Sequence, residues 1–412
     1  MAGSQQTQAA GRLVGDVLGG GVQLAWRVHE AVARRVFGYV GARGRPVQAV
    51  HDAVAGGVYR LVGGAQAAVP RAAAGLVALT GADTDALAAS PRGRLVVEVA
   101  NGLWGDTMAR RYPPLAVPMA VRSAGRDVPS TPAALADAYP AATGRIAVFV
   151  HGLGESEQWW WRTEQRPDGA RRTSFGSRLR DDLGFTPVYL RYNTGLHISA
   201  NGQQLAALLD ELVAGWPAPV QEMALVGHSM GGLVARSACH YGQRAERRWA
   251  TLVRHVVCLG SPHLGAPLER GVHVASWLLA RLPETRPLAG VLNLRSVGLK
   301  DLRFGSCSEA DWCDADPDEF LRDRCTEVPF LPSAAYYFVA ATLTEQPHHP
   351  VGRMVGDLLV QFPSASGRGR RRRVPFEVGT HVGRLHHFDL LTHPAVYEAL
   401  RGWLSGAVPQ QR

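Results

Sequence analysis

Residues 223–236 read M-A-L-V-G-H-S-M-G-G-L-V-A-R, and this stretch decides how the rest of the chain is interpreted. Four apolar residues lead into Gly227-His228-Ser229-Met230-Gly231, and residues 233–239 are compatible with a helix. The pattern G-x-S-x-G between a strand and a helix places a serine on a sharp turn, where the flanking glycines relieve crowding. The motif alone is common, but this context predicts that the hydroxyl of Ser229 is exposed above a parallel sheet as a nucleophile.

Apolar strands and helix-compatible segments alternate on both sides of this motif. We expect strands at residues 145–150, 187–192, 255–260 and 335–343, and helices at residues 174–183, 199–216 and 395–404. Such alternation is typical of a doubly wound, mostly parallel sheet with helices on both faces. The short apolar segment 113–122 is expected to form the first strand, and a helix is expected from Pro91 to Arg111.

A second motif follows directly after the expected strand at residues 145–150. It reads His151-Gly152-Leu153-Gly154. Acyl-transfer hydrolases use such a strand end to turn backbone amides toward a developing oxyanion. The backbone N–H groups of Leu153 and Met230 are therefore the predicted oxyanion hole, with a simple strand-to-loop turn as the alternative. Trp159, in the W-W-W run just beyond, is expected either to line an apolar substrate pocket or to fill the core.

A carboxylate and a histidine near the end of the chain complete the pattern. Asp357 stands alone among the apolar residues of V-G-D-L-L-V, and isolated acids of this kind tend to be partnered. The pair His386-His387 precedes the last expected helix, where a general base belongs. The chain order is therefore serine, acid, histidine, which is the order of the α/β hydrolases.

With these motifs assembled, the chain resembles the α/β-hydrolase lipases and esterases, and more narrowly bacterial proteins similar to the catalytic domain of GPI inositol-deacylases. The resemblance covers roughly residues 146–404. It rests on H-G-L-G, G-H-S-M-G-G, S-P-H-L-G-A-P at 261–267, G-D-L-L-V at 356–360, and H-F-D-L-L-T-H-P at 387–394. It selects His387 over His386 as the base and Asp357 as the acid. Leu358-Leu359 depart from the pattern, because many relatives have glycine and a β-branched residue there.

The implied function is hydrolysis of carboxylic esters by a triad of Ser229, His387 and Asp357 through an acyl-enzyme, with a small molecule or a lipid as the ester substrate. No metal or organic cofactor is expected. His228 and His263 are candidates to line the substrate site, although a structural role is the stronger alternative for His263. Two other functions stay open: an acyltransferase or thioesterase with the same triad, and a hydrolase fold that only binds.

The composition limits the other functional classes. The net charge of +9 comes almost entirely from arginine, and because no nucleic-acid-binding module accompanies it, nucleic acid is not an expected partner. Of the five cysteines, Cys307, Cys313 and Cys325 lie close together in one polar segment and could hold one disulfide or none. No signal peptide or apolar run long enough to span a membrane is found, so the predicted location is cytoplasmic, with peripheral membrane association as an option.

The motifs occupy only part of the chain, which suggests a division into two domains. Residues 1–112 are expected to form an N-terminal helical extension, a hairpin or small bundle, because apolar residues recur at steps of three and four in 11–80. This region is a candidate for helix-mediated or membrane-surface association. Residues 113–408 would form the catalytic domain. Residues 271–332 interrupt its alternating pattern and are expected to be a cap or lid.

Overall fold

The computed structural model describes residues 91–161 and 174–406 except for positions 282, 284, 315, 317, 318, 320, 321 and 377, together with scattered residues before 91. The predicted helical hairpin of residues 11–80 therefore lies almost wholly outside the described residues. The chain forms two units, one of residues 1–97, 107–116 and 271–295, and the other of residues 98–106, 117–270 and 296–412. The second unit carries the sheet and all of the motifs described above.

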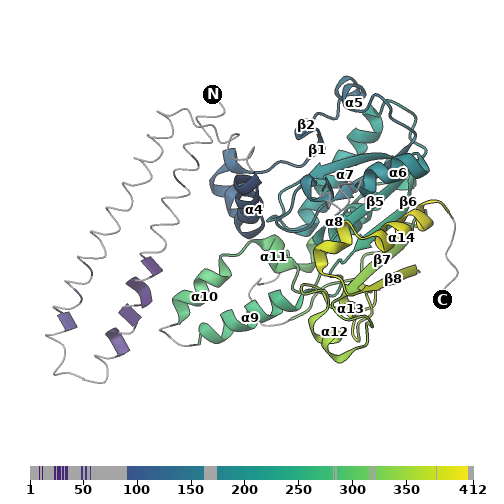
Figure 1. Cartoon of the computed structure of the whole chain (residues 1–412). Helices are drawn as coiled ribbons and strands as arrows, with labels where there is room; N and C mark the ends of the chain where they lie inside the picture. Colours follow the sequence, from purple (N-terminus) through teal and green to yellow (C-terminus); the bar gives the residue numbers. More distant parts are fainter. Residues whose placement is uncertain are drawn as a thin grey trace. The chain divides into compact units, whose positions relative to one another are not determined.

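An eight-stranded sheet forms the centre of this second unit, in the order β2-β1-β4-β3-β5-β6-β7-β8 (Figure 1). Strands β3 to β8 pair in parallel, whereas β1 is antiparallel to both β2 and β4. The strands are β1 (Ala120–Ser123), β2 (Arg126–Val128), β3 (Arg145–Val150), β4 (Thr186–Arg191), β5 (Glu222–His228), β6 (Val253–Leu259), β7 (Ala335–Thr342) and β8 (Val378–Gly383). The predicted α/β-hydrolase fold with a mostly parallel sheet is confirmed.

Helices cover both faces of the sheet, because successive side chains of a strand point to opposite faces. Val148 of β3 belongs to the core formed with α7 (Ile198–Gly215) and α8 (Met230–Arg244). The next residue, Phe149, belongs to the core formed with α6 (Phe175–Leu183) and α14 (Pro394–Leu404). Both side chains are fully buried, which explains why parallel strands of this kind read as continuous apolar runs.

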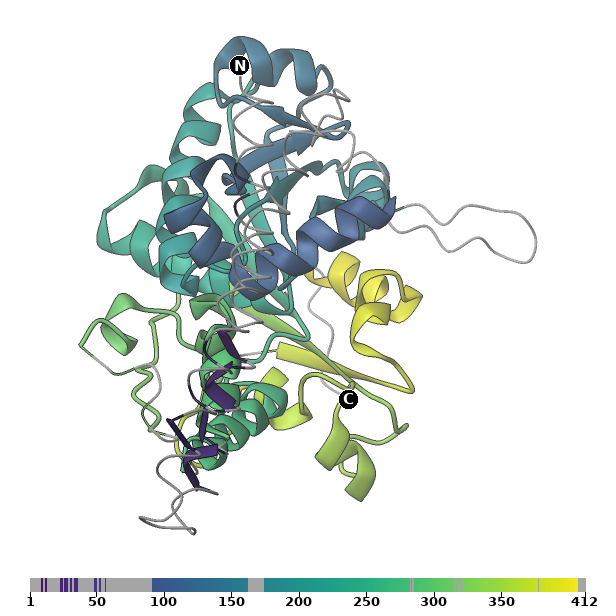
Figure 2. The same cartoon turned by 90° about the vertical axis from the view of Figure 1, so that its left-hand side faces the viewer.

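The remaining helices are shorter or lie outside this layered arrangement. They are α4 (Pro91–Arg111), α5 (Pro132–Ala138), α9 (Pro267–Leu279), α10 (Arg286–Asn293), α11 (Val297–Asp301), α12 (Pro350–Val355) and α13 (Phe362–Ala365). Figures 1 and 2 both show α12 and α13 beside β7 and β8. Among the helices that the structure describes, none combines the length and the apolar character that a bilayer crossing requires.

Two expectations about strands differ from the structure. The segment 113–122 is not one strand: residues Pro113–Leu115 form a 3₁₀ turn, and β1 begins only at Ala120. Three prolines in this segment, Pro113, Pro114 and Pro118, have no N–H to donate to a neighbouring strand, which keeps its first part out of the sheet. Strand β8 was not expected, because V-G-T-H-V-G carries two glycines and little apolar character.

The two halves of the predicted cap belong to different units. In residues 271–295, Ser276 of α9 donates a hydrogen bond to the carbonyl of Ala289 in α10. Residues 296–332 pack along α7 and α8 of the sheet-bearing unit, where the Trp312 indole N–H donates to Ser199 Oγ at 2.9 Å. A lid over the active site therefore stays a prediction for residues 271–295. All five cysteines are free, which excludes a disulfide in this structure.

Candidate active site

Ser229 occupies the one-residue turn between β5 and α8. Its backbone has φ 51° and ψ −123°, a left-handed conformation that costs a non-glycine residue roughly 1–3 kcal/mol. The amide of Ser229 donates to the carbonyl of Leu259 at 2.8 Å, which fixes the turn against β6. A Cβ atom at Gly231 would overlap the carbonyl oxygen of Val150, so the helix can approach β3 only with glycine there. The strand-turn-helix arrangement predicted from the sequence is therefore present.

The loop after β3 passes directly beside this turn. A Cβ atom at Gly152 would lie 3.0 Å from the Cβ of Ser229, so the backbone of the H-G-L-G segment is in contact with the serine. Within the residues that the structure describes, the amides of Leu153 and Met230 donate to no backbone or side-chain acceptor. Both N–H groups are thus available to an oxyanion.

Asp357 and His387 are brought together from two separate loops. Both side chains are buried, and Nδ1 of His387 lies 2.7 Å from Oδ2 of Asp357. The other oxygen, Oδ1, accepts from the amides of Leu359 and Val360 at 3.0 and 2.8 Å. Because the carboxylate accepts on both oxygens, its orientation is fixed, and it holds the His387 proton on Nδ1. Nε2 is then left as the proton acceptor.

The Nε2 atom of His387 is buried and forms no hydrogen bond with any described residue. The bond to Ser229 that a working triad requires is therefore not formed in this structure. Such bonds are often long without substrate and tighten when substrate binds. The imidazole also packs against the loop after β6, since a Cβ atom at Gly260 would lie 3.1 Å from its Cε1.

The three candidates for substrate contact have different surroundings. Trp159 is half-buried, its ring centroid lies 5.0 Å from that of Phe388, and its indole N–H donates to Glu98. His228 is fully buried and hydrogen-bonded to Glu155. His263 is also fully buried, with Nδ1 3.1 Å from the Arg236 guanidinium. Full burial favours a structural role for His263 and a positioning role for His228.

The charges around His263 also favour a structural role for this residue. Burial lowers the pKa of its imidazole well below the usual value, and the charges of Arg236 and Arg372 lower it further. Because the Arg236 guanidinium can only donate, Nδ1 of His263 accepts and the ring is neutral. His263 therefore acts as a neutral acceptor that orients Arg236.

Two acidic residues near the proposed site were not predicted from the sequence. Glu155 directly follows the H-G-L-G motif, and its carboxylate accepts from the Gly152 amide at 2.7 Å. An acidic residue so close to the end of a buried strand could have indicated that Glu155 belongs to the site. Glu98 of α4 accepts from the Ser156 hydroxyl and from the Trp159 indole N–H. It lies 58 residues before Ser156, and nothing in the surrounding sequence marks this pairing.

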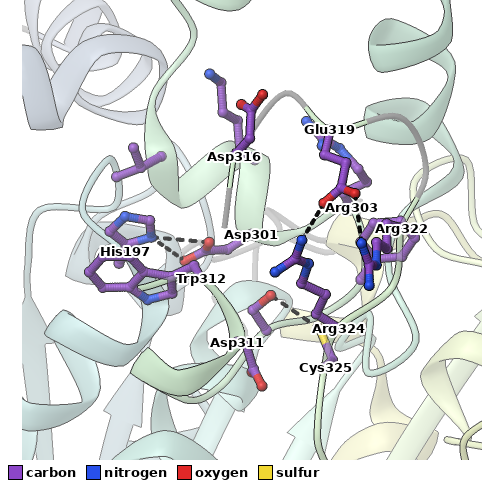
Figure 3. A pocket seen from close by; sticks show the side chains of 14 residues that line it. His197, Asp301, Arg303, Asp311, Trp312, Asp316, Glu319, Arg322, Arg324 and Cys325 are labelled. Atoms are coloured by element: carbon purple, nitrogen blue, oxygen red, sulfur yellow. Dashed lines mark hydrogen bonds and ion pairs between the residues drawn. The ribbon is translucent and has the colours of Figure 1, made fainter. Parts of the chain in front are cut away.

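A separate polar pocket of about 70 Å³ lies in the second half of the insertion (Figure 3). Its charged groups are largely paired with one another. Asp301 accepts from His197 Nδ1 at 3.1 Å, and Glu319 pairs with both Arg322 and Arg324. The His197 ring stacks on Trp312 with centroids 3.7 Å apart. These contacts connect the insertion to the start of α7, and we assign the pocket a structural role.

Comparisons with known proteins show what part of the chain is similar to. Residues 141–277 match the family described as the PGAP1-like alpha/beta domain. This stretch contains β3 to β6, the H-G-L-G loop and the Ser229 turn. No curated protein matches the chain significantly.

Solved structures with a related fold include lipases and esterases. The mature form of Bacillus licheniformis lipase BlEst2 is 20% identical, with a TM-score of 0.42, and the match covers 63% of this chain and 91% of that one. The propeptide form of the same lipase is 18% identical, with a TM-score of 0.46, covering 72% and 55% of the two chains. The carboxylesterase CesB from Bacillus subtilis is 13% identical, with a TM-score of 0.35, covering 65% and 85%. The family match over residues 141–277 confirms the resemblance that the motifs indicated: this part of the chain is similar to the PGAP1-like alpha/beta domain.

Proposed function

We propose that this protein is a serine hydrolase that cleaves carboxylic esters. The observation that supports this most directly is the oriented pair of Asp357 and His387, with its unpartnered Nε2, in a fold whose strained elbow carries Ser229. A serine hydroxyl is a weak nucleophile until a base removes its proton. The Asp357–His387 pair supplies such a base.

In the proposed reaction, His387 Nε2 takes the proton of Ser229 as Oγ attacks the ester carbonyl carbon. The carbonyl oxygen becomes an oxyanion and accepts from the amides of Leu153 and Met230. When the oxyanion collapses, the ester C–O bond breaks and the alcohol leaves with the proton from His387. Water then attacks the acyl-enzyme, with His387 again as base, and releases the acid and free Ser229.

Two exposed apolar side chains support an ester with an apolar acyl group. Leu358 directly follows Asp357 and is 55% exposed, and Phe388 directly follows His387 and is 41% exposed. Large apolar side chains in such positions are candidates for contact with a hydrocarbon ligand. We expect Phe388→Ala to reduce kcat/KM more for long acyl chains than for acetate. Equal losses across p-nitrophenyl esters from acetate to palmitate would contradict this assignment.

The proposal is tested on the full chain with a fluorophosphonate probe and p-nitrophenyl esters. The wild type should be labelled and hydrolytic, whereas Ser229→Ala should lose the label and about 10⁶-fold in kcat. Ser405→Ala is the matched control, because this serine is exposed at the end of α14, where it donates to the carbonyl of Gly402. Labelling that persists in Ser229→Ala, or a folded wild type that is neither labelled nor active, would refute the proposal.

A further inference from the structure

A buried carboxylate and a buried imidazole lie close to the proposed nucleophile. The side chains of Glu155 and His228 are 3% and 0% exposed, and His228 Nδ1 lies 2.9 Å from Glu155 Oε1 and 3.1 Å from Oε2. The proposed mechanism assigns no step to either residue. An acid and a base that are buried together near a reacting group require an explanation, because buried charges are costly unless they are paired.

Each of the three proposed catalytic segments is joined to this pair. Glu155 accepts from the amide of Gly152, which neighbours the predicted donor Leu153, at 2.7 Å. His228 immediately precedes Ser229 in the chain. Its Nε2 lies 3.2 Å from the backbone carbonyl oxygen of His387. The H-G-L-G loop, the Ser229 turn and the loop that holds His387 therefore meet at Glu155 and His228.

The hydrogen-bond partners define the protonation state of His228. Nδ1 faces the Glu155 carboxylate and Nε2 faces a carbonyl oxygen, and both groups only accept. With Glu155 ionised, both ring nitrogens carry a proton, so the ring is an imidazolium. Burial by itself would lower the pKa of His228, but the charge and hydrogen bond of Glu155 and the His387 carbonyl raise it above its usual value. Burial would likewise raise the pKa of Glu155, but His228 and the Gly152 amide lower it.

We propose that Glu155 and His228 form a permanent ion pair that positions the three catalytic segments. This inference rests on the proposed hydrolase function. Glu155 lies on the Nδ1 side of the His228 ring, whereas Nε2 faces the loop that holds His387, so the positive end of the pair is directed toward His387. The ring centroids of the two histidines are 4.8 Å apart.

Three other titratable residues lie near the pair: Asp357, His151 and Tyr192. The Asp357 carboxylate lies 2.7 Å from His387 Nδ1. His151 is fully buried, and burial lowers its pKa, which leaves it neutral beside Glu155. The hydroxyl of Tyr192 donates to the His151 carbonyl, and burial raises its pKa well above the usual value. Among these described neighbours, His228 supplies the positive charge that faces His387.

Glu155→Gln separates the charge from the hydrogen bonds. The glutamine oxygen can still accept from Gly152, and its NH₂ group can donate to a neutral His228 that keeps its Nε2 bond. We expect kcat to fall by less than about tenfold, because the hydrogen bonds of the pair are kept. Glu155→Ala removes the acceptor for Gly152 and should lower kcat by ~10²–10³ with little change in KM.

Glu157→Gln is the matched control, because Glu157 is buried in the same segment but pairs with Arg122 at 3.0 Å. Its kcat should stay near the wild-type value. A wild-type kcat in folded Glu155→Ala, a loss in Glu155→Gln as large as in Glu155→Ala, or a loss of the same size in Glu157→Gln would overturn the inference.

A measurement on the wild type does not depend on any variant folding. In ¹⁵N spectra, both ring nitrogens of His228 should carry a proton at about pH 7, although a free histidine is mostly neutral there. A neutral His228 ring would overturn the ion pair. This readout needs no turnover: an imidazolium signal from protein that lacks esterase activity would refute the hydrolase proposal while leaving the pair intact.

Discussion

The imidazole of His387 is joined to Asp357 twice: Nδ1 lies 2.7 Å from the carboxylate oxygen Oδ2, and the His387 amide donates to the Asp357 carbonyl at 3.0 Å. The side-chain bond fixes the tautomer and the backbone bond fixes the loop. Both residues are almost fully buried, so water does not compete for these bonds. An imidazole held in this way has little freedom to turn.

Asp357→Asn should therefore impair catalysis without unfolding the protein. The asparagine oxygen would remain with the amides of Leu359 and Val360, so its NH₂ group would face Nδ1 of His387 and force the proton onto Nε2. With the wrong nitrogen protonated, kcat should fall by about 10⁴-fold, as in other triads of this kind. Steady-state kinetics with p-nitrophenyl butyrate measures the loss. A variant with unchanged melting temperature and nearly normal kcat would exclude Asp357 as the orienting acid.

Glu98→Ala should loosen the segment that follows the H-G-L-G loop. It removes the acceptor of both the Ser156 hydroxyl and the Trp159 indole N–H. An unsatisfied buried donor costs roughly 1–3 kcal/mol, so the free energy of unfolding should fall by that amount. Urea unfolding and tryptophan fluorescence report the change. Glu345→Ala, which removes an exposed pair with Arg384, serves as the control and should have little effect.

Leu358→Gly should stabilise the protein. Leu358 has φ 88°, a left-handed conformation that disfavours leucine, and its side chain is largely exposed, so little packing would be lost. Relief of the backbone strain should raise the free energy of unfolding by about 1 kcal/mol. Leu359→Gly, at the half-buried neighbour in the same turn, should instead destabilise. Thermal unfolding of both variants tests this, and destabilisation by Leu358→Gly would show that the leucine side chain holds the turn.

The Glu155–His228 pair should give the folding stability a defined pH dependence. The pKa of Glu155 is lowered on folding, so its contribution is present above the unfolded-state pKa of about 4.3 and is lost as the pH falls through the folded-state pKa. The pKa of His228 is raised, so its contribution is complete below about 6.5 and is lost as the pH rises through its folded-state pKa. Both contributions are complete between about pH 4.5 and pH 6.5.

Urea unfolding of the wild type and Glu155→Gln across this range and into alkaline pH measures the effect. The stability difference between the two proteins should be largest in the mildly acidic window and should shrink as His228 loses its proton. A difference that is constant with pH would mean that the pair is not charged in the folded state.

The Ser229 elbow and the strands around it could be predicted from sequence because their signals are local. Apolar runs such as residues 145–150 can only be buried, and glycines at 227 and 231 mark a close approach of helix and strand. Strand β8 could not be predicted from the sequence, because a strand at the edge of the sheet needs little apolar character. The apolar character of segment 113–122 predicts a strand, but the prolines at its start prevent strand pairing there.

The sequence by itself determined the order of the proposed nucleophile, acid and base along the chain and the kind of fold that carries them, because strand periodicity, turn glycines and motif spacing are properties of neighbouring residues. Only the tertiary structure paired Glu155 with His228 and Glu98 with Trp159. These partners are 73 and 61 residues apart. The first pair meets because β3 and β5 are neighbours in the sheet, and the second because α4 packs beside the segment after β3. Such an order reflects the packing of the whole core, and no short stretch of residues encodes it.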